Sequence, residues 1–408
     1  MNPDTKRSNA DPDRGLSLKG SNQSAVRDHN ERLILTLLRN AGPKPKAEVA
    51  RLVGVSTQTA SVIMRNLEKR RLIERCAPLR GKVGQPSIPM QLAPDGALFF
   101  GLKVGRRSSE MVLIDFLGRP IGQKHLTYRY PEPNETLSFA KEAASALSAK
   151  LEPRQRKNIA GLGISMPGYL WEWARIIGEP PEKMSAWRDM DIRAEIQELF
   201  EFPVYLQNDA SCACGAELVF GDHNYPSEML YFYVGYFVGG GVVINGSLFT
   251  GPTGNAGALA PIRLPSTESG ARQLIDIASL SVLEKSILKA GGSAEHMWDR
   301  SMNWNVDPDV LNTWIAAAAE GLAYAIVSAC AVIDFELVVI DGWLPNPVRA
   351  ALVEACRRKR SSLDLSGLVQ PEIWEGTIGP HARVMGAASL PISRQFMTST
   401  SEVAYSFT

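Results

Sequence analysis

The stretch MLYFYVGYFVGGGVVINGSLF, residues 229–249, does most to restrict what this chain can fold into. It is about twenty residues long and nearly free of charge, which meets the length criterion for a membrane-spanning helix. Its apolar residues, however, are largely β-branched or aromatic, and its glycines gather in the middle. That pattern is typical of two buried strands joined by a turn. We therefore expect a strand pair in the core of a sheet-containing domain, and no membrane partner.

The length and the cysteines narrow the options further. With 408 residues the chain is long enough for two or three domains, because single cores stop growing near about 250–300 residues. Its first fifteen residues are polar and charged without an apolar signal segment, so we expect a cytoplasmic protein. Cys212 and Cys214 form a lone C-x-C, whereas a structural zinc site needs four suitably spaced ligands. We therefore expect buried free thiols and no metal site.

The charge is divided unevenly along the chain. Residues 1–92 hold 17 lysines and arginines against 8 acidic residues, a net charge of +9, whereas residues 93–408 carry −8. A basic N-terminal part joined to an acidic remainder predicts that the front of the chain contacts a polyanion such as double-stranded DNA. A basic, solvated surface is the alternative.

Residues 30–69 have the pattern of a helix-turn-helix. Residues 30–42 carry apolar side chains at helical spacing and end on a glycine. The next residues divide into a short helix at 45–53, a turn at Gly54 and a second helix capped by Ser56. In the second helix, apolar residues recur at steps of three and four and are expected to face the domain core: Ala60, Ile63, Met64 and Leu67.

The opposite face of the second helix carries side chains that suit a major groove. Gln58 can bridge adenine, Arg65 can fork onto guanine, and Val62 can touch a thymine methyl group. The DNA contacts predicted for this helix are Ser56, Thr57, Gln58, Thr59, Ser61 and Arg65. An ordinary solvated helix face is the alternative.

A wing is expected after the second helix. The strand-like runs LIERCA and SIPMQLA flank a basic, glycine-rich loop. Arg80, Lys82 and Gln85 in that loop are predicted to reach a minor groove or the flanking backbone. We thus interpret residues 27–93 as an α+β winged helix-turn-helix domain, preceded by a flexible arm at residues 1–26.

The remainder of the chain has an α/β pattern. Three strand-like runs, LFFGLKVG, SSEMVLIDF and PIGQKHLTY, precede a helical segment at 135–151 and another strand, IAGLGISM. This order is typical of an actin-like or ribonuclease-H-like lobe, and a second such lobe should start near Met229. The expected division of the body is a first lobe at 94–209 and 380–395, a second lobe at 210–379 and a tail at 396–408.

Several of these segments together resemble the ROK family of repressors and sugar kinases. They are the helix-turn-helix, the wing tip GQPS, GLGISMPG, QNDAS, the glycine-rich hairpin and GPHARVMGAASL, and they follow the family's order over residues 20–395. The resemblance implies a two-lobed, sugar-kinase-like body. It also implies a transcriptional regulator whose affinity for DNA changes when a sugar or sugar derivative binds.

At the positions that family kinases use for catalysis, this chain has other residues. The first phosphate loop, D-x-G-G-T in such kinases, here has Lys103 at the acid's position, and a lysine cannot hold magnesium. In the second phosphate loop, Tyr236 and Phe237 stand where a hydroxyl residue and a glycine are expected. In the sugar motif A-G-E-x-G-H, Ala258 replaces the acid and Pro261 the histidine, and the zinc loop is missing. The comparison implies that the chain is not an enzyme and holds no cofactor.

The positions that remain predict an effector site. Its expected residues are Asn208, Asp209, Pro167, Gly168, Gly257 and Asp276. Asp209 matches the family's catalytic base, although it is an equally good cap for the helix that follows. Pro167 and Gly168 can shape a pocket wall or an ordinary turn after a strand. Lys103 and Arg106 favour an anionic or phosphorylated sugar.

Two functions compete for this chain. The first is a DNA-binding regulator, most simply a repressor, of carbohydrate-related genes, with a catalytically inactive sugar-kinase-like domain. The alternative is a bifunctional sugar kinase with an added DNA-binding domain, supported by Asp209 and by fold resemblance alone. We favour the first. A homodimer or higher homo-oligomer is expected because paired half-sites extend the DNA contact of one winged helix. The apolar residues 310–333 are expected inside the body or at a subunit interface.

Overall fold

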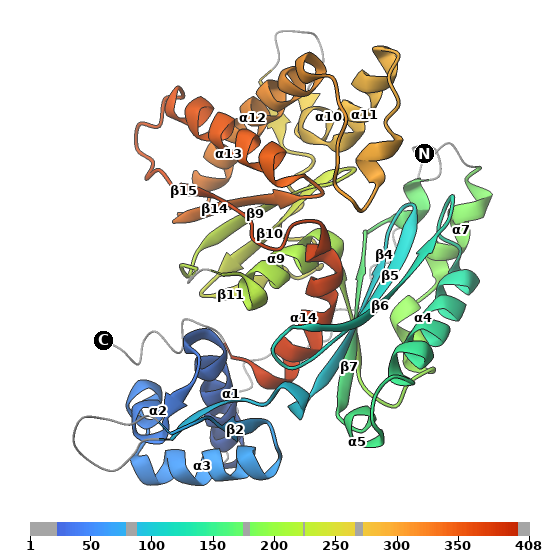
Figure 1. Ribbon diagram of the computed structural model, residues 1–408. Coiled ribbons are helices and arrows are strands. Elements are labelled where there is room, and N and C mark those ends of the chain that lie inside the picture. Colours follow the sequence, from blue (N-terminus) through green and yellow to red (C-terminus); the bar gives the residue numbers. More distant parts are fainter. Residues whose placement is uncertain (1–22, 79–87, 174–179, 223–224, 266–271, 399–408) are drawn as a thin grey trace, which may run out of the picture.

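The computed structural model describes residues 23–78, 88–173, 180–222, 225–265 and 272–398. Within these residues, the N-terminal domain packs helices on a small antiparallel sheet (Figure 1). Its helices are α1 (Gln23–Ala41), α2 (Lys46–Val53) and α3 (Thr57–Lys69). Its strands are β1 (Lys44–Pro45), β2 (Ile73–Arg75) and β3 (Pro89–Leu92), in the order β1-β3-β2. The winged helix-turn-helix fold is thereby confirmed.

The turn between α2 and α3 has the expected local chemistry. Gly54 ends α2 at φ 74°, a left-handed conformation that glycine adopts without strain. Ser56 caps the N-terminus of α3, and its Oγ accepts a hydrogen bond from the Thr59 amide at 3.0 Å. The residues predicted to face the core are all buried: Ala60, Ile63, Met64 and Leu67.

Helix α1 begins earlier than the sequence suggested. The expected flexible arm ran to residue 26, whereas α1 already starts at Gln23. Residues 27–29 of α1 are polar and exposed, and a polar, exposed helical turn has the same composition as an arm. Residues 1–22, the rest of the predicted arm, lie outside the described residues.

The body contains two lobes whose sheets share one strand order (Figure 1). The first sheet, in the order β6-β5-β4-β7-β8, consists of β4 (Leu98–Val104), β5 (Ser108–Ile114), β6 (Pro120–Thr127), β7 (Ile159–Met166) and β8 (Val204–Asn208). The second, in the order β11-β10-β9-β14-β15, consists of β9 (Met229–Val234), β10 (Val238–Ile244), β11 (Ser247–Phe249), β14 (Leu337–Gly342) and β15 (Glu372–Glu375). In both, the first three strands are antiparallel and the last two run parallel to the first. The actin-like, ribonuclease-H-like architecture is therefore confirmed.

Residues 229–249 form the antiparallel strands β9, β10 and β11 of the second sheet. The strand interpretation of this stretch is thus confirmed over a membrane helix. The glycines of β10 have a packing role: a Cβ added at Gly241 would lie 2.4 Å from the Cβ of Cys214 on α9 (Asp209–Phe220). The strand needs glycine there because the helix lies directly on it.

Helices cover the outer faces of both sheets. In the first lobe they are α4 (Pro133–Ser148), α5 (Pro153–Arg156), α7 (Glu182–Asp189) and α8 (Ile192–Gln197). In the second lobe they are α10 (Ile275–Ala278), α11 (Leu280–Lys289), α12 (Pro308–Cys330) and α13 (Asn346–Ser361). Short elements complete the described chain: η1 (Pro94–Gly96), η2 (Leu170–Trp173), η3 (Glu295–Trp298), η4 (Gly379–His381), β12 (Arg263–Leu264) and β13 (Arg272–Gln273).

Helix α12 is the apolar segment expected inside the body or at an interface. Among the described residues it is the single helix long and apolar enough to cross a membrane, and half of its apolar window is buried. Its buried residues, including Trp314 and Leu322, belong to the core of the second lobe, and α12 packs against α10 and α13. Burial within the body therefore accounts for much of its apolar character.

Two helices cross between the sheets and join the lobes. Helix α14 (Ala382–Phe396) packs on the first sheet, α9 packs on the second, and the two helices pack on each other (Figure 1). A Cβ added at Gly386 would lie 1.8 Å from the carbonyl oxygen of Cys212. The helices approach this closely only because glycine has no side chain there. Cys212 and Cys214 are buried free thiols, as expected.

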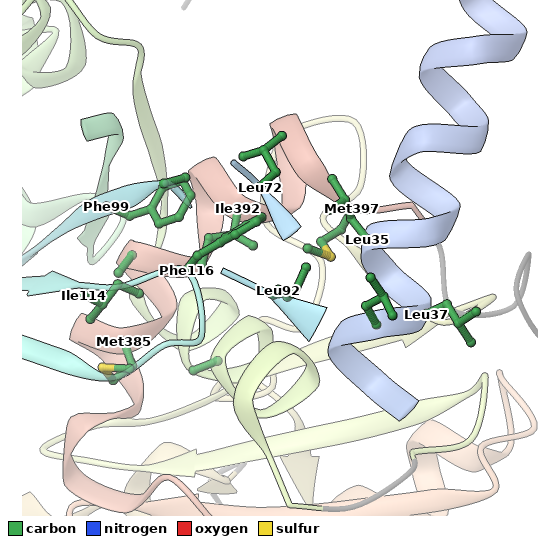
Figure 2. Close-up of a cluster of buried hydrophobic side chains, with 14 of the residues drawn as sticks. Leu35, Leu37, Leu72, Leu92, Phe99, Ile114, Phe116, Met385, Ile392 and Met397 are labelled. Atoms are coloured by element: carbon green, nitrogen blue, oxygen red, sulfur yellow. The ribbon is translucent and has the colours of Figure 1, made fainter. Parts of the chain in front are cut away.

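One hydrophobic core spans the winged domain and the first lobe (Figure 2). Leu35 and Leu37 of α1 belong to the same cluster as Phe116 of the first lobe and Ile392 of α14. The Phe396 ring at the end of α14 lies 5.0 Å from that of Phe116, edge to face. The DNA-binding domain is thus packed onto the body.

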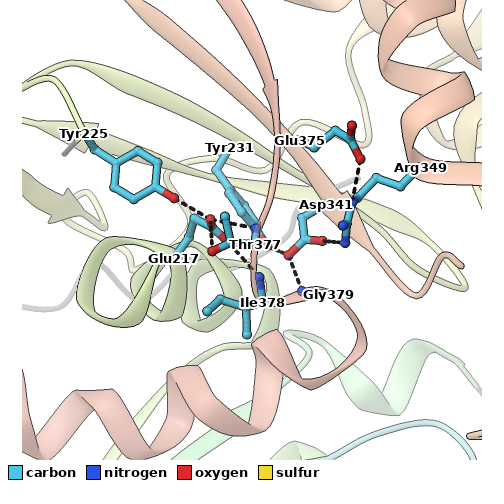
Figure 3. Close-up of polar contacts among 9 residues, drawn as sticks. All are labelled: Glu217, Tyr225, Tyr231, Asp341, Arg349, Glu375, Thr377, Ile378 and Gly379. Atoms are coloured by element: carbon cyan, nitrogen blue, oxygen red, sulfur yellow. Dashed lines mark hydrogen bonds and ion pairs between the residues drawn. The ribbon is translucent and has the colours of Figure 1, made fainter. Parts of the chain in front are cut away.

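Polar contacts hold the other end of α14 against the second lobe (Figure 3). The Asp341 carboxylate of β14 accepts a hydrogen bond from the Gly379 amide at 2.8 Å, just before α14 begins. Glu217 of α9 accepts hydrogen bonds from the amide and hydroxyl of Thr377, each at 2.8 Å. Burial raises the pKa of Asp341 to about 6. Helix α14 therefore contacts the second lobe at its start, the first lobe along its length and the winged domain at its end.

Candidate functional site

The outward face of α3 presents the side chains expected to contact DNA. Thr57, Gln58 and Arg65 are exposed, and Val62 keeps 50% of its surface accessible. Ser61 is partly buried beside them. The opposite face is buried in the domain core, so α3 can enter a groove without losing its packing.

Ser56 and Thr59 have a structural task at the start of α3. Their hydroxyl oxygens lie 2.8 Å apart in a hydrogen bond, and Ser56 also caps the helix. Both residues remain exposed at the helix N-terminus, where the backbone favours a phosphate.

The base of the wing is a strand pair. Strands β2 and β3 pair antiparallel, with Ile73 opposite Leu92. The predicted wing-tip residues Arg80, Lys82 and Gln85 lie outside the described residues.

A cavity of about 430 Å³ lies between the two lobes of the body. It brings together most of the predicted effector residues, namely Pro167, Gly168, Asn208, Asp209 and Gly257. These come from the end of β7, the start of α9 and the loop after β11, segments that are far apart in the sequence. The residues that replace family catalytic groups line the same space, namely Tyr236, Phe237, Ala258 and Pro261, and Ile275 lines it as well.

Asn208 and Asp209 both contact the first turn of α9. Asn208 is the cap of α9, because its side-chain oxygen accepts a hydrogen bond from the Ala210 amide at 3.0 Å. Asp209 Oδ1 accepts from the same amide at 3.0 Å, and its Oδ2 forms an ion pair with Arg383 of α14 at 3.3 Å. The pair also ties α9 to α14 at the cavity wall.

Asp276 does not reach the cavity. Its carboxylate is exposed and accepts a hydrogen bond from the Gln273 amide at 3.0 Å. Ile275 lines the cavity in its place. Successive residues of α10 differ by about 100° in direction, so one of these two neighbours can face the ligand space and the other faces away.

A second hollow of about 320 Å³ adjoins the cavity and is strongly basic. Five cationic side chains line it against one carboxylate, Glu110: Lys103, Arg106, Arg107, Arg300 and Arg383. Lys103 is 6% exposed, and its Nζ donates to Ser108 Oγ at 3.1 Å. Burial, together with the nearby charge of Arg383, lowers the pKa of Lys103 to about 7.

Aromatic side chains lie where the cavity adjoins this basic hollow. The Arg106 guanidinium carbon lies 3.4 Å from the centre of the Tyr236 ring, and Tyr236 packs against Trp298 at 5.7 Å. The ring of Phe237 lies 4.8 Å from that of Tyr236, edge to face. Side chains therefore fill the position where the second phosphate loop of a kinase presents bare backbone.

Sequence reasoning missed Arg383, Arg300 and Trp298. The motif containing Arg383 was recognised, but the side chain was not assigned a role. A lone arginine opening the otherwise apolar run ARVMGAASLPI was an available signal. Nothing local marked Arg300 or Trp298, because the loop that carries them reaches the site only through the fold. No cluster of three or more potential metal ligands occurs within the described ranges.

Comparison with known sequences relates the chain to regulators. Residues 99–394 match the model of the ROK family, and residues 27–74 match that of winged helix-turn-helix DNA-binding domains. A xylose repressor of Caldicellulosiruptor bescii is 26% identical over 74% of this chain and 76% of its own length. The Escherichia coli transcriptional dual regulator NagC is 22% identical over 60% of this chain and 59% of its own.

Solved structures share the fold. A ROK family transcriptional regulator, a homologue of the E. coli Mlc protein, superposes with a TM-score of 0.67 at 17% identity, covering 93% of this chain and 98% of its own. A ROK family glucokinase from Streptomyces griseus, solved with glucose and AMPPNP, has a TM-score of 0.57 at 17% identity, covering 72% and 99%. The additional coverage in the regulator is consistent with the winged domain being part of the shared architecture.

Proposed function

Because the chain belongs to the ROK family and carries a winged helix-turn-helix domain, we propose that it is a DNA-binding transcriptional repressor of carbohydrate-related genes, controlled by a sugar or sugar derivative. Relatives named as xylose repressors and as an N-acetylglucosamine repressor support a sugar effector. The effector site is the interlobe cavity, and the DNA site is the exposed face of α3.

The observation that carries this proposal is the position of α14. Arg383, in its first turn, lines the cavity and pairs with Asp209. At its other end, Ile392 shares a core with α1 of the winged domain. The amide of Thr398, just beyond α14, donates to Thr36 Oγ1 of α1 at 3.1 Å. A ligand that moves one lobe relative to the other therefore moves an element on which the DNA-binding domain rests.

We further propose that the body does not phosphorylate sugars. Lys103 would repel the magnesium ion that a kinase holds near its transferred phosphate. The Tyr236 and Phe237 rings occupy the path of the second phosphate loop. Asp209 lines the cavity and is paired with Arg383. The alternative of a bifunctional kinase therefore rests on this carboxylate alone, without the magnesium and phosphate sites that a kinase needs.

The proposed working form is a cytoplasmic homodimer. A single α3 contacts few base pairs, and a two-fold pair of such helices reads two half-sites. Apolar side chains exposed on the second lobe, Val332 at 83% and Val369 at 70%, are candidates for subunit contact. Size-exclusion chromatography with light scattering measures the oligomeric state.

The test begins with selection of genomic DNA fragments by the purified full-length chain. Fluorescence anisotropy then measures the affinity for the recovered fragment, with and without a panel of sugars and sugar derivatives. We expect at least one member of the panel to change the affinity, and we expect an Arg383→Met variant to bind DNA with a much smaller response. Failure to select any fragment would refute the DNA-binding function, and ATP-dependent hexose phosphorylation lost in Asp209→Asn would favour the kinase.

A further inference from the structure

The basic hollow next to the interlobe cavity has more positively charged side chains than carboxylates to pair with them. Glu110 is paired with Arg300 at 2.7 Å, and Asp209 is paired with Arg383 at 3.3 Å. No carboxylate lies within ion-pair distance of Lys103, Arg106 or Arg107 in the described part of the chain. A concave site that holds two arginines without a carboxylate partner, beside the buried amine of Lys103, favours an anion.

The cations are placed to contact a single group. The Arg106 guanidinium carbon lies 3.4 Å from the centre of the Tyr236 ring, a cation–π contact that restrains the side chain. A guanidinium in such a contact can still donate two parallel hydrogen bonds to an anion. Lys103 projects from β4 into the same hollow and is almost completely buried. A buried ammonium without a carboxylate is costly, and a bound anion relieves that cost.

The hollow and the cavity share three lining residues, Arg106, Tyr236 and Arg383. A molecule lying in the cavity therefore has the cations of the hollow beside it. The cavity wall offers Asn208, Asn255 and Glu172, which suit hydroxyl groups. The two spaces together match a polyhydroxylated molecule that ends in a charged group.

We propose that this hollow binds the anionic group, a phosphate or a carboxylate, of an effector whose hydroxylated part occupies the interlobe cavity. This inference rests on the proposed sugar-responsive function and specifies the chemical class of the effector. Lys103 and Arg106 contact the anion directly, without the magnesium ion that a kinase places between protein and phosphate. A neutral sugar leaves these cations unsatisfied and binds more weakly.

Isothermal titration calorimetry on the full chain tests the proposal with four probes: inorganic phosphate, glucose 6-phosphate, glucuronate and glucose. We expect at least one sugar anion to bind about tenfold or more tightly than glucose, because hydrogen bonds to charged groups are the strong ones. If inorganic phosphate and glucose 6-phosphate both bind, the anionic group of the effector is a phosphate. If glucuronate is the single anion that binds, the group is a carboxylate.

Substitutions in the basic hollow test whether the anion binds there. Arg106→Gln and Lys103→Met are each expected to weaken the preferred anion about tenfold or more. Lys124→Gln is the matched control: Lys124 lies on β6 between His125 and Gln123, is exposed and does not line the hollow. Equal binding of glucose and all anions, or anion binding that survives Arg106→Gln and Lys103→Met, would overturn the proposal.

A parallel titration with DNA distinguishes the proposed ligand class from the proposed repressor function. Each variant is assayed against the selected DNA fragment without any ligand, where we expect wild-type affinity. Anion binding in a chain that selects no DNA would support the ligand class while refuting the repressor. Intact DNA binding with no anion binding at the hollow would refute the ligand class alone.

Discussion

Replacing Lys103 with methionine should change how the stability of the protein depends on pH. In the folded chain the pKa of this amine falls from 10.5 to about 7, chiefly through burial. Between these two values the unfolded chain binds more protons than the folded chain, so the free energy of unfolding rises with pH. At about 1.4 kcal/mol per pKa unit, the full effect approaches about 5 kcal/mol. Methionine has nearly the same length and no titrating group, so the free energy of unfolding of Lys103→Met should not show this rise with pH.

Urea unfolding followed by tryptophan fluorescence measures the effect across a series of pH values. We expect the wild type to gain up to about 1.4 kcal/mol per pH unit relative to Lys103→Met above pH 7. Below pH 7 the difference in the free energy of unfolding between the two proteins becomes constant, and Lys103→Met is the more stable because it buries no charge. Lys124→Met, at an exposed position, should follow the wild type. Parallel curves for the wild type and Lys103→Met would refute the claim that Lys103 is buried among like charges.

Three further predictions concern DNA contact and packing. Arg65→Ala should weaken operator binding by about 1 to 3 kcal/mol in anisotropy titrations if this exposed side chain contacts a base, and an unchanged affinity would remove it from the contact face. Gly386→Ala should lower the free energy of unfolding by about 3 kcal/mol or more, because the new Cβ would lie 1.8 Å from the Cys212 carbonyl oxygen. Gly168→Ala, where no atom lies within 4 Å, is its control and should be nearly neutral for stability. Arg39→Ala removes a guanidinium packed between α1 and the body, so hydrogen exchange in α1 should become about tenfold faster, and unchanged exchange would show that α1 does not depend on this contact.

Local rules predicted the elements of the winged domain well. The spacing of Ala60, Ile63 and Met64 identified the buried face of α3, and Ser56 was correctly predicted as its N-terminal cap. Both signals depend on neighbours within one or two helical turns. The same holds for the strands of residues 229–249. Their β-branched and aromatic residues correctly predicted strands, although the length of the stretch also suited a membrane helix.

The ligand site was only partly predictable because its charges come from distant parts of the chain. The ion pair between Asp209 and Arg383 joins residues 174 positions apart, and Arg300 meets Glu110 across 190. Spacing along the sequence holds no information about such pairs. Asp276 shows the opposite error, because its place in the sequence does not give the direction in which helix α10 turns its side chain.

The core that joins α1 to α14 also constrains how the protein can be made. The contact between Thr36 and Thr398 spans 362 residues, so α1 leaves the ribosome long before its packing partner is translated. Until then the part of its apolar face that meets α14 has no cover, although α2, α3 and β3 already pack on the rest. A fragment that stops short of α14 therefore exposes apolar surface that chaperones and proteases recognise. Incomplete chains are therefore poor candidates for stable occupation of an operator. The fold thus favours DNA binding by molecules that also carry the body that regulates it.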